Sequence, residues 1–182
     1  DKLGYSRDFT IYDTPDQLNR VKTIMAELQL DTAQWKPRSI AGAISNAKNK
    51  LVGAEAFASA ASGYYNLTVA QIYKKYESLL KANNALDFDD LLVKSIELFK
   101  KHPDILEMYQ DKFKFILVDE YQDTNYAQYT LTRLPAGKYR NICVTGDPDQ
   151  SIYRWRGADI RNIMDFEKDY PDARVVLLEQ NY

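Results

Sequence analysis

The sequence predicts a mixed α/β fold, in which a mainly helical first half precedes a parallel sheet. Apolar residues recur every three or four positions through most of the first half, which is the period of an amphipathic helix. In the second half, short apolar runs rich in β-branched residues alternate with helical segments, as in a sheet with helical crossovers. The length of 182 residues allows one ordinary domain or slightly more.

The composition is typical of a globular chain, with 45% hydrophobic and 27% charged residues. It excludes a disordered tail and a collagen-like fibre, and the single cysteine excludes a disulfide scaffold. We find neither a membrane-spanning apolar run nor a signal-peptide core, and therefore expect a cytoplasmic location. With 24 basic and 26 acidic residues, the chain lacks the positive charge of a DNA-packaging protein.

Helix-start signals and apolar periodicity define the helices of the first half. Thr14 precedes Pro15 and Gln17, so we expect Thr14 to cap a helix that continues to about residue 28. Pro37 opens a second helix, and the small residues of 53–63 form either a short helix or a mobile connection. Further helices are expected over 67–80, over 87–101 with Asp87 as its N-cap, and from Pro103.

Apolar runs of the second half have the composition of buried parallel strands. The runs cover 114–119, 141–146 and 174–178, with helices expected over 124–134 and 158–170 between them. Cys143 lies in the middle of the second run, so we expect its side chain to be buried. The first two runs lead into carboxylates, and ligands of parallel sheets bind beyond the carboxyl ends of the strands.

The segment FILVDEYQDTN at 115–125 places two adjacent acids at the tip of an apolar strand, which is the arrangement of a Walker B motif. In such a site the first acid, here Asp119, holds Mg²⁺. The second acid, Glu120, polarises the water that attacks a γ-phosphate. The alternative is that Asp119 and Asp123 simply cap the next helix.

The next motif is VTGDPDQSIYRWRGA at 144–158. Gly146 and Pro148 set a tight turn, and Gln150 is a neutral group able to reach a phosphate or a water molecule. Aromatic side chains and arginines then alternate: Tyr153, Arg154, Trp155 and Arg156. Aromatic faces stack on bases and arginines contact phosphates, so this segment is a candidate platform for single-stranded nucleic acid. The alternative is a loop whose aromatic side chains fill the core.

These motifs, together with two further segments, resemble those of the UvrD/PcrA/Rep group of superfamily 1 DNA helicases. The matching segments are ALDFDDLL at 85–92, DEYQDTN at 119–125, GDPDQSIYRWRGA at 146–158 and LEQNY at 178–182. The last three resemble helicase motifs II, III and the start of IV, in order and spacing. The resemblance implies a helical inserted domain at 1–86 and, at 87–182, part of a RecA-like domain of the P-loop NTPase type.

The resemblance also implies roles for residues that match the motifs. Asp119 would coordinate Mg²⁺, Glu120 would be the general base for ATP hydrolysis, and Gln150 would sense the γ-phosphate. Tyr182 would stack on the adenine of ATP. Single-stranded DNA would contact Phe88, Tyr153, Trp155 and Arg156. The implied activity is that of an ATP-dependent helicase, which translocates on single-stranded DNA and unwinds duplex DNA in the 3′→5′ direction.

Part of the family pattern is missing from the sequence. No GxxxxGK[ST] phosphate-binding loop occurs in the 182 residues, and the sequence ends at Tyr182, before the arginine that the family places against the γ-phosphate. We therefore expect an internal piece of a longer helicase, inactive by itself, that binds ATP weakly or not at all. Sheet edges left without neighbouring strands predict that such a piece associates with itself.

Two other classes of function remain open. A binding module would hold DNA or a protein partner through the same segments without turnover. A metal-dependent nuclease would need carboxylates that converge on one or two metal ions, and its candidates are Asp119, Glu120, Asp123, Asp147 and Asp149. The order of the motifs favours the helicase over both. Asp89 and Asp90 lie outside this set, and we expect them to orient neighbouring groups.

Overall fold

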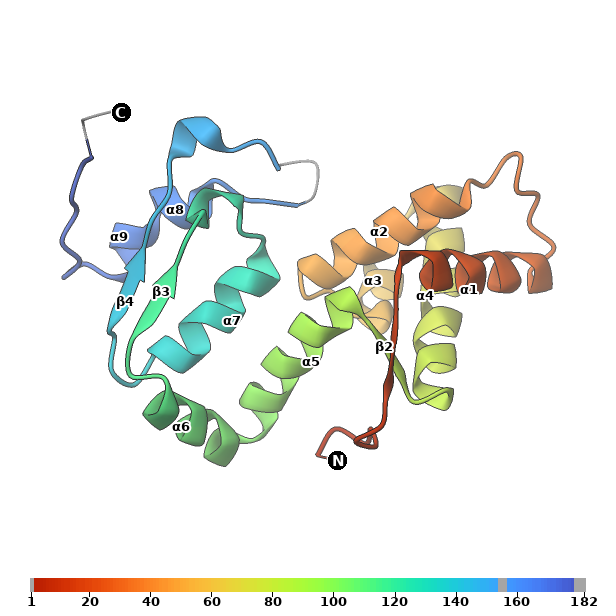
Figure 1. The fold of residues 1–182 in the computed structure, drawn as a ribbon. Coiled ribbons are helices and arrows are strands. Elements are labelled where there is room, and N and C mark those ends of the chain that lie inside the picture. Colours follow the sequence, from red (N-terminus) through yellow and green to blue (C-terminus); the bar gives the residue numbers. More distant parts are fainter. Residues whose placement is uncertain (1, 154–156, 179–182) are drawn as a thin grey trace.

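The computed structural model describes residues 2–153 and 157–178 (Figure 1). The helices are α1 (Thr14–Glu27), α2 (Pro37–Asn49), α3 (Ala54–Ala60), α4 (Gly63–Ala82), α5 (Phe88–Lys101), α6 (Pro103–Lys112), α7 (Tyr126–Ala136), α8 (Arg161–Met164) and α9 (Phe166–Asp169). The strands are β1 (Thr10–Tyr12), β2 (Ala85–Asp87), β3 (Ile116–Val118) and β4 (Ile142–Val144). The 3₁₀ turns η1 (Tyr121–Asp123) and η2 (Pro148–Gln150) follow β3 and β4. The mixed α/β class is confirmed.

Each strand pairs in parallel with a strand distant in the sequence. Thr10 of β1 lies opposite Ala85 of β2, and Ile116 of β3 lies opposite Ile142 of β4. Neither β1 nor β2 was predicted from the sequence, because three residues are too few to show a strand period. Since β2 ends at Asp87, the expected division between residues 86 and 87 falls inside this strand.

We call helices α1–α4 the helical part. Within it, α1, α2 and α4 enclose a hydrophobic core. Its most buried members include Val21, Ile24, Met25, Ile40, Val69 and Ile72. The N-cap of α1 is Asp13, so the prediction of Thr14 was wrong by one residue. The Asp13 carboxylate accepts a hydrogen bond from the Asp16 amide at 2.9 Å, and Asp16 completes the capping box in return.

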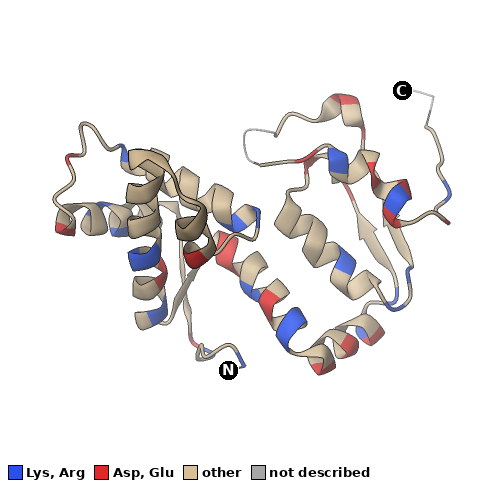
Figure 2. Ribbon diagram, turned by 180° about the vertical axis from the view of Figure 1, so that it is seen from behind, with Lys and Arg blue, Asp and Glu red and all other residues tan. Residues whose placement is uncertain are grey.

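Helix α5 lies between the helical part and the β3–β4 pair, and it contacts both α2 and α7 (Figure 1). Its first turn carries the acids Asp89 and Asp90, and its last turn carries Lys100 and Lys101 (Figure 2). This order of charges complements the helix dipole. Asp87 is the N-cap of α5, as predicted. The start of α5 is therefore held by local signals as well as by packing on both sides.

The β3–β4 pair is less buried than the sequence predicts. Leu117 is 79% exposed, and Cys143 is exposed rather than buried. Residues 174–178 form no strand, which corrects the prediction of a third one, and the described part of the chain leaves their apolar side chains exposed. The physical reason is that a buried strand requires a hydrogen-bonded neighbour and a covering layer. The helix expected over 158–170 forms instead as the short helices α8 and α9.

Among the described residues, we find no helix with the length and apolar character needed to cross a membrane.

Candidate functional site

The carboxyl ends of β3 and β4 bring the two acidic motifs together. The Thr145 amide donates a hydrogen bond to the Val118 carbonyl at 2.9 Å, which extends the pairing beyond the strands. The Asp119 carboxylate lies at this point and accepts hydrogen bonds from the Thr145 hydroxyl and from the Glu120 amide. These hydrogen bonds, that of Thr145 first, lower the pKa of Asp119. Asp119 is therefore ionised at neutral pH, as a ligand of a divalent cation must be.

Glu120 follows in a left-handed backbone conformation, with φ 51° and ψ 41°, which turns the chain sharply at the end of β3. Its carboxylate accepts a hydrogen bond from Nε2 of Gln122 at 2.7 Å. Gln122 is buried, and its Oε1 accepts a hydrogen bond from the Asp147 amide at 3.1 Å. The buried Gln122 side chain thus connects the Glu120 carboxylate to the backbone of Asp147.

Gln150 lies in η2, where its Nε2 donates a hydrogen bond to Oδ2 of Asp147 at 2.8 Å. A line of hydrogen bonds therefore runs from Glu120 through Gln122 and Asp147 to Gln150. The structure brings three predicted residues, Asp119, Glu120 and Gln150, to one edge of the sheet. We call these three residues the carboxylate edge.

Asp119 of the carboxylate edge and the adjacent Thr145 hydroxyl are oxygen donors that fit a magnesium ion which keeps most of its water ligands. Among the described residues, no group of three or more His, Cys, Asp or Glu side chains is placed to hold a metal ion. The five acids of the nuclease hypothesis all belong to the described residues.

Gly146 of the second motif lies close to Tyr121 and Gln122 of the first motif. A Cβ atom at this position would overlap Oε1 of Gln122, and it would lie 2.9 Å from Cδ1 of Ile163 and 3.2 Å from the Tyr121 amide nitrogen. A side chain here must displace the amide that connects the two motifs. The glycine is thus required by the close approach of its neighbours.

We expect Gly146→Ala to lower the free energy of unfolding by about 1–3 kcal/mol, because the added methyl group overpacks a closed site. Urea denaturation followed by circular dichroism measures the change. Gly42→Ala is the matched control, since apart from its chain neighbours and the nearby backbone of its own helix no atom lies within 4 Å of a Cβ at that position. Equal losses of stability in both variants would contradict the close approach at Gly146.

A cleft of about 690 Å³ lies beside these motifs, between α2 and the first turn of α5, and its remaining lining comes from η1, α7 and the segment after η2. We call it the α2–α5 cleft. Phe88 and Tyr153 both line it, with 56% and 38% of their surfaces exposed. The two aromatic residues, predicted from separate motifs, therefore share one cleft.

Asn49 of α2 connects the elements that line the α2–α5 cleft. Its Nδ2 donates a hydrogen bond to Oδ1 of Asp89 at 3.2 Å, and its Oδ1 accepts one from Nδ2 of Asn125 at 2.9 Å. Asn125 also caps α7 by accepting a hydrogen bond from the Gln128 amide. Asp89 thus orients a neighbouring group, as predicted. Asn49 was not predicted, because nothing in the sequence near it indicates partners on α5 and α7.

Three predicted contacts, those of Trp155, Arg156 and Tyr182, lie outside the described residues. Among the described residues that line the α2–α5 cleft, the charged ones, Asp89 and Asp123, are both acidic. Contacts to phosphate in this cleft would therefore require basic side chains from outside that set.

Sequence reasoning also missed Gln122 and Thr145, whose side chains orient the acids of the carboxylate edge. Both residues lie inside or next to the quoted motifs. The available signal was their position, since Thr145 is the first residue after β4 and Gln122 follows the acid pair by two residues.

Comparison with known proteins identifies the family. The chain matches the UvrD/REP helicase N-terminal domain over residues 1–171. It belongs to this family. Over all 182 residues it is 55% identical to the ATP-dependent DNA helicase PcrA of Bacillus subtilis, and 51% identical to PcrA proteins of Staphylococcus epidermidis and Staphylococcus aureus. The chain spans 25% of the length of these relatives. The family resemblance read from the motifs is thereby confirmed.

Proposed function

We propose that this UvrD-type chain serves an ATP-dependent DNA helicase by supplying the Mg²⁺ ligand, the general base and part of the path for single-stranded DNA. The observation that carries the proposal is the carboxylate edge beside the α2–α5 cleft. The relatives named above are ATP-dependent DNA helicases, which supports the same assignment. In this proposal residues 1–86 are an inserted helical domain and residues 87–182 are part of a RecA-like domain.

At the carboxylate edge, Asp119 would hold Mg²⁺, which when bound would supply positive charge beside the phosphates of ATP. Glu120 accepts the proton of the attacking water, while Gln122 holds its carboxylate in place. Gln150 is exposed and turns from Asp147 toward the γ-phosphate. The 182 residues contain no phosphate-binding loop, so the isolated chain has no turnover of its own.

In the α2–α5 cleft, the rings of Phe88 and Tyr153 stack on bases of single-stranded DNA. Tyr153 follows Gln150 by three residues, and its amide hydrogen bonds to Oδ1 of Asp123 at 3.4 Å. The short segment from Gln150 to Tyr153 therefore connects the carboxylate edge to the α2–α5 cleft. This continuity is the route by which the state of the nucleotide changes the contact with DNA.

Phe88→Ala is expected to weaken the binding of single-stranded DNA about 5- to 150-fold, which corresponds to about 1–3 kcal/mol for one stacked base. Fluorescence anisotropy of a fluorescein-labelled oligothymidylate at fixed salt concentration measures the change. Phe113→Ala is the matched control, because Phe113 is 45% exposed but does not line the α2–α5 cleft. If both variants bind with the affinity of the unmodified chain, the proposed DNA contact is wrong.

A further inference from the structure

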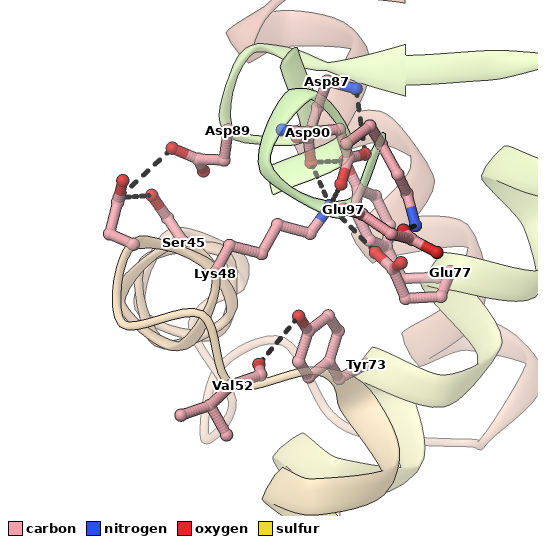
Figure 3. Close-up of polar contacts among 12 residues, drawn as sticks. Ser45, Lys48, Val52, Tyr73, Glu77, Asp87, Asp89, Asp90 and Glu97 are labelled. Carbon is pink, nitrogen blue, oxygen red and sulfur yellow. Dashed lines mark hydrogen bonds and ion pairs between the residues drawn. The ribbon is translucent and has the colours of Figure 1, made fainter. Parts of the chain in front are cut away.

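Lys48 of α2 is buried between the helical part and the start of α5 (Figure 3). Its side chain is 1% exposed, and its Nζ lies 2.8 Å from Oε1 of Glu77, 2.8 Å from Oδ2 of Asp87 and 2.7 Å from Oδ1 of Asp90. Glu77 belongs to α4, Asp87 ends β2, and Asp90 is in the first turn of α5. The Lys48 ammonium group thus connects its own helix, α2, to three elements that lie further along the sequence: α4, β2 and α5.

The two aspartates that bind Lys48 also form the capping box of α5. Oδ1 of Asp87 accepts a hydrogen bond from the Asp90 amide at 2.8 Å, and Oδ2 of Asp90 accepts one from the Asp87 amide at 3.2 Å. The Tyr76 hydroxyl donates a further hydrogen bond to Oδ2 of Asp87 at 3.0 Å. All four carboxylate oxygens therefore have a hydrogen-bond or ion-pair partner, and this network holds the first turn of α5.

Phe88 lies between Asp87 and Asp89 in the sequence, and its side chain is exposed. It is the first residue of α5, and its ring lines the α2–α5 cleft. Lys48 holds the preceding residue, Asp87, while Asn49 holds the following residue, Asp89. Two consecutive residues of α2 thus fix both sequence neighbours of the exposed ring.

Burial disfavours a charged ammonium group, yet three carboxylates outweigh this effect and raise the pKa of Lys48 above its ordinary value. Lys48 is therefore charged at neutral pH. If its charge is removed, Asp87 and Asp90 remain buried beside each other without a countercharge. The repulsion is relieved when one carboxylate moves out of the capping box or takes up a proton, and either change alters the contacts that hold the backbone at Phe88.

We propose that Lys48 is a positioning residue for single-stranded DNA, which acts through Asp87 and Asp90 to hold the Phe88 ring in the orientation that stacks on a base. The inference rests on the proposed function, because Phe88 meets a base only if the α2–α5 cleft binds DNA. An ion cluster with a merely structural role changes the folded fraction of the chain. A positioning residue also changes the affinity of the folded molecules for single-stranded DNA.

The test compares Lys48→Met, Phe88→Ala and the double variant in the 182-residue chain, with circular dichroism used to choose a temperature at which each is folded. The probe is an oligothymidylate with one central 2-aminopurine, whose fluorescence is quenched on stacking. We expect Lys48→Met to weaken binding at least about fivefold and to reduce the quenching on binding. In the Phe88→Ala background, the same change is expected to weaken binding by less than about twofold, because coupled residues are not additive.

Tyr76→Phe is a milder second variant, since it removes only the hydroxyl that donates to Asp87. We expect it to weaken binding about two- to threefold, again only when Phe88 is present. Lys75→Met is the matched control, because Lys75 forms an exposed ion pair with Glu27. It is expected to leave the affinity unchanged. If Lys48→Met does not fold, Tyr76→Phe decides the question by the same comparison.

Two different results would overturn the inference, and they are distinguishable. If Phe88→Ala leaves the affinity unchanged, the proposed DNA contact at this ring fails, and the inference fails with it. If Phe88→Ala weakens binding, but Lys48→Met and Tyr76→Phe act equally with and without the ring, the proposed function stands. In that second case the positioning role alone is rejected.

Discussion

Lys48→Met is expected to lower the free energy of unfolding by about 3–5 kcal/mol, because it leaves two buried carboxylates without their countercharge. Methionine is close to lysine in size, so the variant tests the charge more than the packing. Urea denaturation at pH 7, followed by circular dichroism, measures the loss. The exposed pair of Lys75 with Glu27 is the reference, and Lys75→Met is expected to cost less than about 1 kcal/mol.

The loss of stability caused by Lys48→Met should depend on pH. The burial of Asp90 determines the direction of this dependence. Burial already raises the pKa of Asp90 to about 6, while Lys48 acts to lower it. Without Lys48 the pKa of Asp90 in the folded chain rises further above its unfolded value. The folded state then binds more protons than the unfolded state, so the stability of the variant increases as the pH falls from 7 toward 4.

Two results would contradict the assigned ion cluster. One is a loss of stability below about 1 kcal/mol at pH 7, which is the range of an exposed ion pair. The other is a loss that is the same at pH 7 and pH 5. The double variant Lys48→Met/Asp90→Asn provides a further check. It is expected to be more stable than Lys48→Met alone, because it removes one of the two unpaired charges.

The helices could be predicted from the sequence because their signals are local. Pro37 and Asp87 mark the starts of α2 and α5 within a few residues of the observed bounds. Strands depend on partners elsewhere in the chain. The sequence therefore did not reveal that residues 10–12 would pair with 85–87, or that residues 174–178 would remain unpaired.

The candidate site could be predicted only where its residues are close together in the sequence. Asp119, Glu120 and Gln150 lie in two short motifs, each placed by the strand before it. Lys48 contacts Asp87 across 39 residues, and Asn49 contacts Asn125 across 76 residues. The only local sign of such contacts was the spacing of Ile40, Ile44 and Lys48, which puts a lysine on the apolar face of α2. That spacing marks a buried charge, but it does not identify the partner.

Glu120→Gln is expected to lower the rate of ATP hydrolysis about 10²- to 10⁴-fold in a complete helicase that carries this sequence, because an amide cannot accept the proton of the attacking water. The geometry should be preserved, since the amide oxygen of the new side chain can still accept the hydrogen bond of Gln122. DNA-stimulated phosphate release measures the rate. Glu167→Gln, at an exposed position of α9, is the matched control and should hydrolyse ATP at the unmodified rate.

The binding of Mg²⁺-ATP separates the role of Glu120 from that of Asp119. If Glu120 is the general base, Glu120→Gln keeps its affinity for a fluorescent ATP analogue while turnover falls, because the carboxylate that holds the metal is unchanged. Asp119→Asn, in contrast, should weaken the binding that depends on Mg²⁺. A loss of nucleotide binding in Glu120→Gln would mean that Glu120 holds the metal. Turnover within about fivefold of the unmodified rate would mean that another group takes the proton.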